Sequence, residues 1–355
     1  MSAHPVPPLP RPVHELDLAA LGSLVACAFP DNAMVRCEAM PGGASTRRYF
    51  RVILTRGTAV AMFVPEGAKA SEVDKGHAIL DRWPFLEVRD LLSSRGVDVP
   101  AVYGEDTSRG WVLLEDLGDQ TLASFLRSHP GEREALYCRA VADLARAQEA
   151  LAILPEGSVV ASRVFDQELL SWEIDHFREW ALEARGVVLS SEDRALFASI
   201  GERLARSIAA WPRTFVHRDY QSRNLMVRPD RRLCWVDFQD ALLGPRVYDL
   251  VALLNDSYQQ FGPEFVGARL NDYARARSLD AGGRAALGRE FDIVTVQRKL
   301  KDAGRFVFID RVRGNPSFLR FVEPTIEKAR ASLARLRDDA DMRALDDLLT
   351  RLLEG

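Results

Sequence analysis

The residues best suited to chemistry lie in two short segments of the second half of the chain. The first reads His217-Arg218-Asp219-Tyr220-Gln221-Ser222-Arg223-Asn224 and the second reads Asp237-Phe238-Gln239-Asp240. Their joint spacing matches H-x-D-x-x-x-x-N followed by D-F-x, an arrangement used for phosphoryl transfer. That reaction needs a carboxylate within hydrogen-bond reach of the hydroxyl that accepts the phosphoryl group. We therefore predict that Asp219 is the catalytic carboxylate.

Phosphoryl transfer also needs oxygen ligands for Mg²⁺, which prefers hard donors in octahedral geometry and bridges the phosphates. Asn224 and Asp237 carry such oxygens, and we predict that they are the metal ligands. Asp240 is open to two interpretations, a contact to a second metal ion or the cap of a turn. His217 is interpreted as a scaffold of the loop, because the template aims the carboxylate at the acceptor.

Two further segments are predicted to hold the nucleotide. A Gly-Gly turn near residue 42 would bring backbone N–H groups and hydroxyls to phosphate oxygens, although most such turns only connect strands. Near residue 115, an apolar strand runs into two acids and a glycine, as expected of a hinge that offers backbone groups to adenine. The predicted nucleotide-binding residues are Gly42, Gly43, Ser45, Thr46, Arg48, Glu115 and Leu117.

The elements around these segments change character along the chain. Before residue 115 the sequence predicts one helix, over 16–29, then strands over 35–40, 49–54, 59–64 and 110–114, with a second helix over 73–94. After residue 119 long helical patterns dominate, at 166–183, 191–211 and 291–312 among others, and a β-hairpin joins the two chemical segments at 225–236. We predict an N-terminal arm, helix and β-rich nucleotide lobe at 1–114, a hinge at 115–119, and a helical catalytic and substrate-binding lobe at 120–355.

Composition narrows the class of protein. The 355 residues carry a formal net charge of -4, which argues against nucleic acid as a partner. The four cysteines are scattered without a C-x-x-C pair, and the proline-rich start lacks the apolar region of a secretory signal. Because no apolar run is long enough to span a membrane, we expect a folded cytoplasmic protein with no membrane partner and an oligomeric state that the sequence leaves open.

The order of these segments resembles the aminoglycoside phosphotransferase and choline kinase superfamily, from about Val35 to Tyr258. The resemblance implies an α+β, protein-kinase-like two-lobed fold with a small β-rich N-lobe and a larger helical C-lobe, using ATP and Mg²⁺. Within it, Gly43 to Arg51, His217 to Leu225 and Asp237 to Ala241 look like bacterial kinases that phosphorylate the anomeric hydroxyl of N-acetylmuramate or N-acetylglucosamine. Further segments that carry this likeness are Gly244-Pro245, Tyr248-Asp249-Leu250 and Gln297-Arg298-Lys299-Leu300-Lys301.

This likeness implies a sugar kinase of cell-wall recycling, with a small-molecule sugar as its acceptor. Two alternatives stay open: a kinase for an aminoglycoside, a choline-like amine or another small alcohol, and a nucleotide-binding pseudokinase that acts as a regulatory module. An amine acceptor calls for a cluster of acids in the C-terminal lobe. The pseudokinase is favoured by a missing lysine and opposed by the intact Asp219, Asn224 and Asp237.

The missing lysine is a departure from the protein-kinase pattern. The third-strand motif V-A-I-K is replaced by Val60-Ala61-Met62-Phe63, so another cation should offset the triphosphate charge. Four residues are candidates for this cation, and neither Glu72 nor Glu87 can be assigned the acidic half of the usual ion pair. The candidates are Arg47, Arg48, Lys69 and Lys75.

Substrate contacts are expected from the helical lobe, where aromatic and charged residues mix at 172–176 and 305–315. Amphipathic helices also carry such residues for solubility alone. An arginine at 305, 311 or 313 could pair with the lactyl carboxylate of muramate, because a guanidinium fork matches a carboxylate. The predicted substrate residues are Asp175, His176, Arg305 and Arg311.

Overall fold

The computed structural model describes residues 16–41, 47–65 and 82–354. These residues form two compact units, the first drawn from Met1–Trp83 and Pro100–Gly118, the second from Pro84–Val99 and Asp119–Gly355. Each unit is described by itself below.

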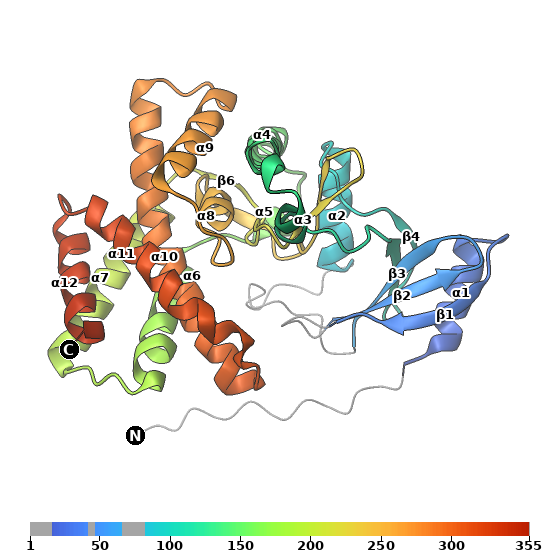
Figure 1. Cartoon of the computed structure of the whole chain (residues 1–355), viewed down its shortest axis with the longest axis horizontal. Helices are drawn as coiled ribbons and strands as arrows, with labels where there is room; N and C mark the ends of the chain where they lie inside the picture. The colour runs from blue at the N-terminus through green and yellow to red at the C-terminus, as the bar shows by residue number, and fades with distance from the viewer. Residues whose placement is uncertain (1–15, 42–46, 66–81, 355) are drawn as a thin grey trace. The chain divides into compact units, whose positions relative to one another are not determined.

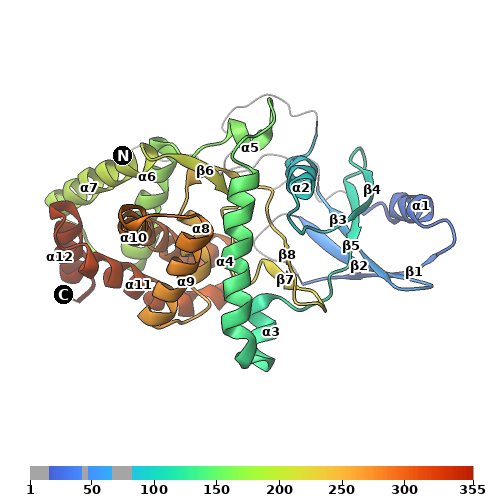
Figure 2. The same ribbon diagram turned by 90° about the horizontal axis from the view of Figure 1, so that it is seen from above.

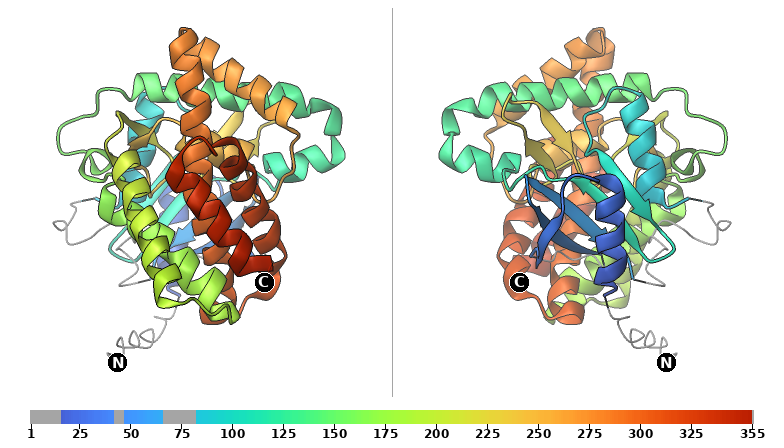
Figure 3. Two further views of the ribbon diagram at one scale, coloured as in Figure 1. Left: turned by 90° about the vertical axis from the view of Figure 1, so that its left-hand side faces the viewer. Right: turned by 90° about the vertical axis from the view of Figure 1, so that its right-hand side faces the viewer.

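The first unit is one antiparallel sheet with a helix on its face. Its strands have the order β1-β2-β3-β5-β4, and α1 packs on one face of the sheet (Figure 3). The helix begins where the Asp17 side chain accepts a hydrogen bond from the Ala20 amide, an N-cap. The elements are α1 (Leu18–Ala28), β1 (Met34–Ala39), β2 (Arg48–Leu54), β3 (Thr58–Phe63), β4 (Val102–Asp106) and β5 (Trp111–Glu115).

Alternating side chains explain why β2 lies in this sheet. Phe50, Val52 and Leu54 are buried against α1, and the residues between them are more exposed, as expected of a strand with one face on a core. Trp111 of β5 is fully buried in the same core, and its indole N–H donates to the Asp17 carbonyl at 3.1 Å. The sequence predicted the first helix and four of these strands. It missed β4, a short edge strand in which glycine and acids hide the pattern.

The second unit is mainly helical. Its helices are α2 (Pro84–Ser94), α3 (Leu122–Ser128), α4 (Arg133–Ala150), α5 (Val159–Ser162), α6 (Gln167–His176), α7 (Ser191–Ala209), α8 (Tyr248–Leu254), α9 (Pro263–Ala276), α10 (Ala281–Arg313), α11 (Val322–Arg335) and α12 (Ala340–Glu354). A π-helical turn, Phe177–Leu182, follows α6. Two small antiparallel sheets complete the unit, β6 (Arg213–Val216) with β9 (Leu242–Pro245) and β7 (Leu225–Val227) with β8 (Leu233–Trp235).

The long helix α10 is the centre of this unit. It packs against α6, α8 and α11 (Figure 1), while α4 packs against α9 (Figure 2). Asp280 caps its N-terminus, and at its C-terminus Gly314 adopts a positive φ of 66° that ends the helix. The sequence predicted a helix only over residues 291–312, because the glycine-rich start Ala281-Gly282-Gly283 has low helix propensity.

The first unit is therefore β-rich and the second mainly helical, as the sequence predicted. The predicted helix over 73–94 is observed from Pro84 onward as α2, which belongs to the second unit, and residues 66–81 lie outside the described residues. No helix in the described ranges is long and apolar enough to cross a bilayer.

Candidate active site

Two short antiparallel pairs bring the chemical segments together in the second unit. Val216 pairs with Leu242, so the segment after β6 and the segment before β9 leave the same end of one sheet. The β7–β8 hairpin closes the other side, where the Val236 amide donates to the Asn224 carbonyl at 3.0 Å. The predicted hairpin is confirmed, and it places residues 217–224 beside residues 236–241.

The start of the catalytic segment is held by a buried carboxylate that the sequence had marked only through resemblance. Asp249, in the first turn of α8, accepts the amides of His217 at 2.7 Å and Arg218 at 3.0 Å. Burial raises the pKa of Asp249 to about 7, while these two hydrogen bonds act in the opposite direction. Arg218 has a positive φ of 79°, rare for a residue with a side chain, so the loop depends on contacts that fix this backbone.

Arg298 of α10 supplies such a contact. Its Nη1 donates to the Arg218 carbonyl at 2.7 Å and its Nη2 donates to Asp219 Oδ1 at 3.3 Å, while the guanidinium lies 4.6 Å from the Tyr248 ring centroid. Sequence reasoning had quoted Arg298 only as part of a resembling motif. Its contacts to both residues show that α10 positions the catalytic segment.

Asp219 is accessible and charged in this setting. Its side chain is 38% exposed, whereas that of Arg298 is 3% exposed. Burial alone would raise the pKa of Asp219, but Arg298, Lys301 and Arg218 together hold it below its usual value. An acceptor hydroxyl can therefore reach an ionised carboxylate at this point of the loop.

A buried carboxylate balances the neighbouring cation. Glu173 of α6 is fully buried and accepts hydrogen bonds from Gln297 at 2.9 Å and Arg218 at 3.3 Å. Burying a single charge costs free energy, and the pairing of Glu173 with Arg218 offsets that cost for both side chains.

His217 is fully buried, and its Nδ1 accepts the Asp219 amide at 3.3 Å. Burial lowers the pKa of His217 to about 4 despite the nearby Asp219 carboxylate. The ring is therefore neutral near pH 7. A neutral, enclosed imidazole agrees with the interpretation of His217 as a scaffold.

The two predicted metal ligands lie on the neighbouring segments. Asn224 Nδ2 donates to the Asp219 carbonyl at 2.9 Å, which leaves Oδ1 as an acceptor. Asp237 is exposed and has a positive φ of 65°. Gln239 Nε2 donates to Asp237 at 2.9 Å and to Asp240 at 3.0 Å, and so holds both carboxylates near each other.

These donors fit Mg²⁺, which is held in kinases by one or two carboxylates together with phosphate oxygens and water. Among the described residues no group of three or more His, Cys, Asp or Glu side chains forms a metal site. A site made of one carboxylate, one amide oxygen and nucleotide phosphates does not need such a group.

The predicted nucleotide residues fall in the first unit. Gly42, Gly43, Ser45 and Thr46 lie outside the described residues. Arg48 begins β2, where its guanidinium lies 5.3 Å from the Phe50 ring centroid, and Glu115 ends β5, where its carboxylate accepts the Ala101 amide at 3.2 Å. Leu117 is half-buried.

Asp116 is a residue of the predicted hinge that sequence reasoning did not single out. Its carboxylate accepts Arg51 Nε at 2.8 Å and the Gly118 amide at 2.9 Å. Arg51 lies on β2, so this pair ties the segment after β5 back to the sheet. The repeated acids at 115–116 were the available signal.

No lysine ends the third-strand segment: the buried Phe63 stands at the lysine position of V-A-I-K. Lys69, Lys75 and Glu72 lie outside the described residues. Glu87 belongs to α2, and its carboxylate accepts the Val159 amide at 2.5 Å within the second unit.

Of the four predicted substrate residues, His176 and Arg305 lie together against one ring, and Asp175 and Arg311 do not. His176 is buried among Trp172, Trp180 and Phe308, and Arg305 lies 4.9 Å from the Phe308 ring centroid. Asp175 instead pairs with Arg178 through both carboxylate oxygens, and Arg311 is exposed beside Asp310.

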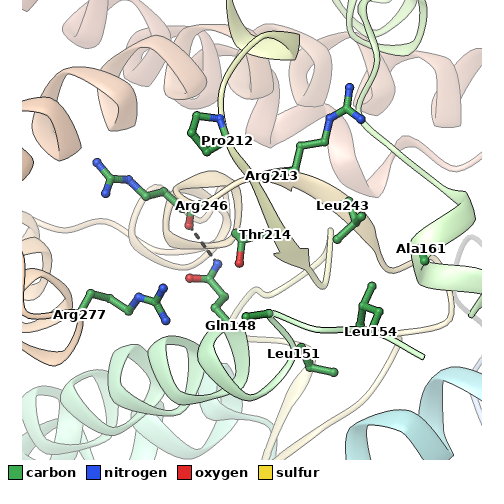
Figure 4. A pocket seen from close by; sticks show the side chains of 11 residues that line it. Gln148, Leu151, Leu154, Ala161, Pro212, Arg213, Thr214, Leu243, Arg246 and Arg277 are labelled. Carbon is green, nitrogen blue, oxygen red and sulfur yellow. Dashed lines mark hydrogen bonds between the residues drawn. The ribbon is translucent and has the colours of Figure 1, made fainter. Parts of the chain in front are cut away.

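A hollow of about 380 Å³ lies elsewhere in the second unit (Figure 4). Arg213, Arg246 and Arg277 line it, and Gln148 Nε2 donates to the Arg246 carbonyl at 3.1 Å. None of the predicted site residues lines this hollow. Arg246 is already paired with Glu290, so one of the three cations is engaged.

The sequence of this chain is similar to those of known phosphotransferases. The sequence model of the phosphotransferase enzyme family matches residues 36–287, which include both chemical segments. The chain belongs to the phosphotransferase enzyme family. This phosphotransferase is 33% identical over 320 residues to the N-acetylmuramate/N-acetylglucosamine kinase of Pseudomonas aeruginosa, covering 88% of this chain and 87% of the relative. It is also 33% identical to the enzyme of the same name from Neisseria meningitidis serogroup B, covering 82% and 86%.

Solved structures show the same fold. The gentamicin complex of APH(2″)-IIa has a TM-score of 0.59 at 15% identity, covering 91% of this chain and 97% of that one. A choline/ethanolamine kinase family protein from Mesorhizobium loti has the same TM-score and identity, covering 94% and 100%. The predicted protein-kinase-like fold is therefore confirmed.

Proposed function

We propose that this phosphotransferase is an ATP- and Mg²⁺-dependent kinase that phosphorylates the anomeric hydroxyl of N-acetylmuramate or N-acetylglucosamine. The observation that carries this proposal is its 33% identity, over 88% of its length, to a relative named for these two sugars. The accessible, ionised Asp219 beside two candidate metal ligands supports the same reaction. Its product would return recycled cell-wall sugar to metabolism in the cytoplasm.

In this mechanism Asp219 accepts a hydrogen bond from the acceptor hydroxyl and takes its proton late, as oxygen attacks the γ-phosphoryl group. Arg298 keeps the carboxylate ionised and aimed, and the Arg218 backbone is held by Asp249 and Arg298 together. Asn224 and Asp237 would hold Mg²⁺, which neutralises charge on the phosphates when bound.

Nucleotide binding is proposed for residues of the first unit. The backbone near Glu115 and Leu117 would contact adenine, while the segment 42–46 and Arg48 would face the phosphates. Asp116 supports this hinge through its bonds to Arg51 and Gly118. Arg48 and Arg47 are the described residues proposed to replace the missing lysine.

The test measures ADP formation with Mg²⁺-ATP and each of five acceptors: N-acetylmuramate, N-acetylglucosamine, glucose, choline and gentamicin. We expect rapid turnover only with the two N-acetyl amino sugars. Asp219→Asn should lower kcat about 10²- to 10⁴-fold and leave KM within about threefold. Asparagine keeps the size and the hydrogen bonds of the side chain, and only the basic carboxylate is lost. Turnover with choline or gentamicin alone would replace the proposal by an amine kinase, and ATP binding without turnover would indicate a regulatory module.

Metal binding gives a second prediction. Asp237→Asn should raise the Mg²⁺ concentration needed for half-maximal activity by about tenfold or more, since an ionised ligand is replaced by a neutral one. Asp230→Asn removes the same charge from the exposed turn at the opposite end of the β7–β8 hairpin and serves as the control. An unchanged Mg²⁺ requirement in Asp237→Asn would contradict its role as a ligand.

A further inference from the structure

Arg223 lies on a small aromatic surface beside the catalytic carboxylate. Its guanidinium carbon is 3.5 Å from the ring centroid of Tyr258 and 5.7 Å from that of Phe321. The two rings meet edge to face, 4.9 Å apart at 86°. Both rings are half-buried and Arg223 is exposed. We call Arg223, Tyr258 and Phe321 the Arg223 platform.

Arg223 differs from the other cations around the catalytic segment in its partners. Within the described ranges its recorded contacts are to aromatic rings, and no carboxylate forms an ion pair with it. A guanidinium stacked on a ring keeps its N–H groups in the plane of the stack, directed outward. The ring contacts thus hold the side chain in place, while its N–H groups make no hydrogen bond among the described residues.

The acids that surround the platform are already engaged elsewhere. Asp219 is bonded by Arg298, and Asp302 is paired with Lys299 at 2.7 Å and with Lys301 at 3.1 Å.

Asp256, the third acid near Tyr258, accepts the amide and the hydroxyl of Ser222. The positive charge of Arg223 is therefore left for an anion that is not part of this chain.

The platform is held rigidly with respect to Asp219. Consecutive residues of α10 reach both, since Arg298 bonds Asp219 and Lys299 Nζ donates to Ser257 Oγ at 3.3 Å. Asp256 accepts the Tyr258 amide at 2.8 Å as well as the Ser222 amide at 3.0 Å. A molecule bound on the platform would thus be placed at a fixed distance from the catalytic carboxylate.

We infer that Arg223, held on Tyr258 and Phe321, binds the carboxylate of an acidic acceptor sugar while Asp219 binds its reacting hydroxyl. This inference rests on the proposed function and names Arg223 as its specificity residue for N-acetylmuramate. One sugar ring separates the lactyl carboxylate of N-acetylmuramate from its anomeric hydroxyl, and three residues of one loop lie between Asp219 and Arg223.

The structure favours this arginine over those that the sequence suggested. Arg305 and Arg313 both lie against Phe308, at 4.9 and 5.9 Å from its centroid, and Arg311 faces Asp310. None of the three belongs to the segment that carries Asp219.

The experiment is a cycle of two changes, Arg223→Gln in the protein and methyl esterification of the lactyl carboxylate in the substrate. Wild-type and variant chains are assayed with N-acetylmuramate, its methyl ester and N-acetylglucosamine at saturating Mg²⁺-ATP. For N-acetylmuramate we expect Arg223→Gln to raise KM about tenfold or more, with kcat within about twofold. For the ester and for N-acetylglucosamine the KM should change less than twofold, because neither has the carboxylate.

Two further variants sharpen the result. Arg223→Lys keeps the charge without the planar fork, and should give a KM between those of the wild type and Arg223→Gln. Arg206→Gln removes another exposed arginine, from α7, and should leave every KM unchanged.

Equal loss on acid and ester, or a raised KM for ATP, would overturn the inference in favour of a role at the phosphates. A wild-type chain that turns over neither sugar would overturn the proposed function itself, which is a different observation.

Discussion

At the scale of single residues, the site depends on an arginine that acts through its neighbours. Arg298 bonds the carboxylate of Asp219 and the carbonyl of Arg218 with two ends of one rigid guanidinium. Since Arg218 has a positive φ, its peptide needs an external contact to stay in place. Lysine carries the charge but cannot make both bonds with one planar group.

We predict that Arg298→Met lowers kcat about 10- to 100-fold, because a displaced carboxylate no longer meets the acceptor hydroxyl. The KM for ATP and for the sugar should stay within about threefold, and Arg298→Lys should recover part of the loss. Steady-state kinetics on variants with wild-type circular dichroism make the measurement. A change in KM for ATP without a fall in kcat would show that Arg298 does not position Asp219.

At the scale of elements, the site requires α10 to lie close to the segment that follows α6. Gly304 makes this possible, since a Cβ atom there would come within 2.5 Å of the His176 carbonyl. Gly288 lies on the same helix with open space around it. Replacing Gly304 therefore tests close packing, and replacing Gly288 tests helix propensity alone, within one helix.

We predict that Gly304→Ala lowers the free energy of unfolding by about 1–3 kcal/mol, because α10 must shift away from the carbonyl. Gly288→Ala should raise it by about 0.5–1 kcal/mol, since alanine favours the helix and meets nothing. Urea denaturation of both variants tests this. Equal effects of the two substitutions would mean that the close approach is unimportant for stability.

At the scale of the whole molecule, buried ionisable groups link stability to pH. The pKa of His217 is about 4 in the folded chain against 6.5 normally, so the unfolded state binds the proton first as pH falls. The contribution of neutral His217 to the free energy of unfolding is present above pH 6.5 and is lost as pH falls from 6.5 to about 4. Asp249 acts with the opposite sign, because its raised pKa of about 7 lets the folded chain bind a proton first.

The contribution of His217 can be separated by comparing wild type with His217→Asn, which cannot titrate. We predict that the difference in their free energies of unfolding shrinks by about 2 kcal/mol between pH 7 and pH 5. Urea denaturation at each pH provides the measurement, with His129→Asn, on an exposed ring beside Ser128, as the control. A constant difference over this range would indicate that His217 is protonated in the folded chain.

The sequence by itself determined the family, the fold class and the segments in which chemistry is expected. These are local properties: H-x-D-x-x-x-x-N and D-F-x fix residue types at short spacing, and the hairpin between them follows from two short apolar runs joined by a polar turn. The roles of Asp219, Asn224 and Asp237 stay predictions, now with a geometry that fits them. The edge strand β4 and the start of α10 escaped because glycine and acids weaken local propensity.

Only the tertiary structure decided which distant residues complete the site. Asp249, Glu173 and Arg298 reach the catalytic segment from three different helices, and no spacing along the chain reveals such contacts. The same holds for Arg223, which became a candidate for substrate recognition only when Tyr258 was found beneath it. Long-range packing makes these contacts, since the folding of the helices around α10 determines which side chains meet.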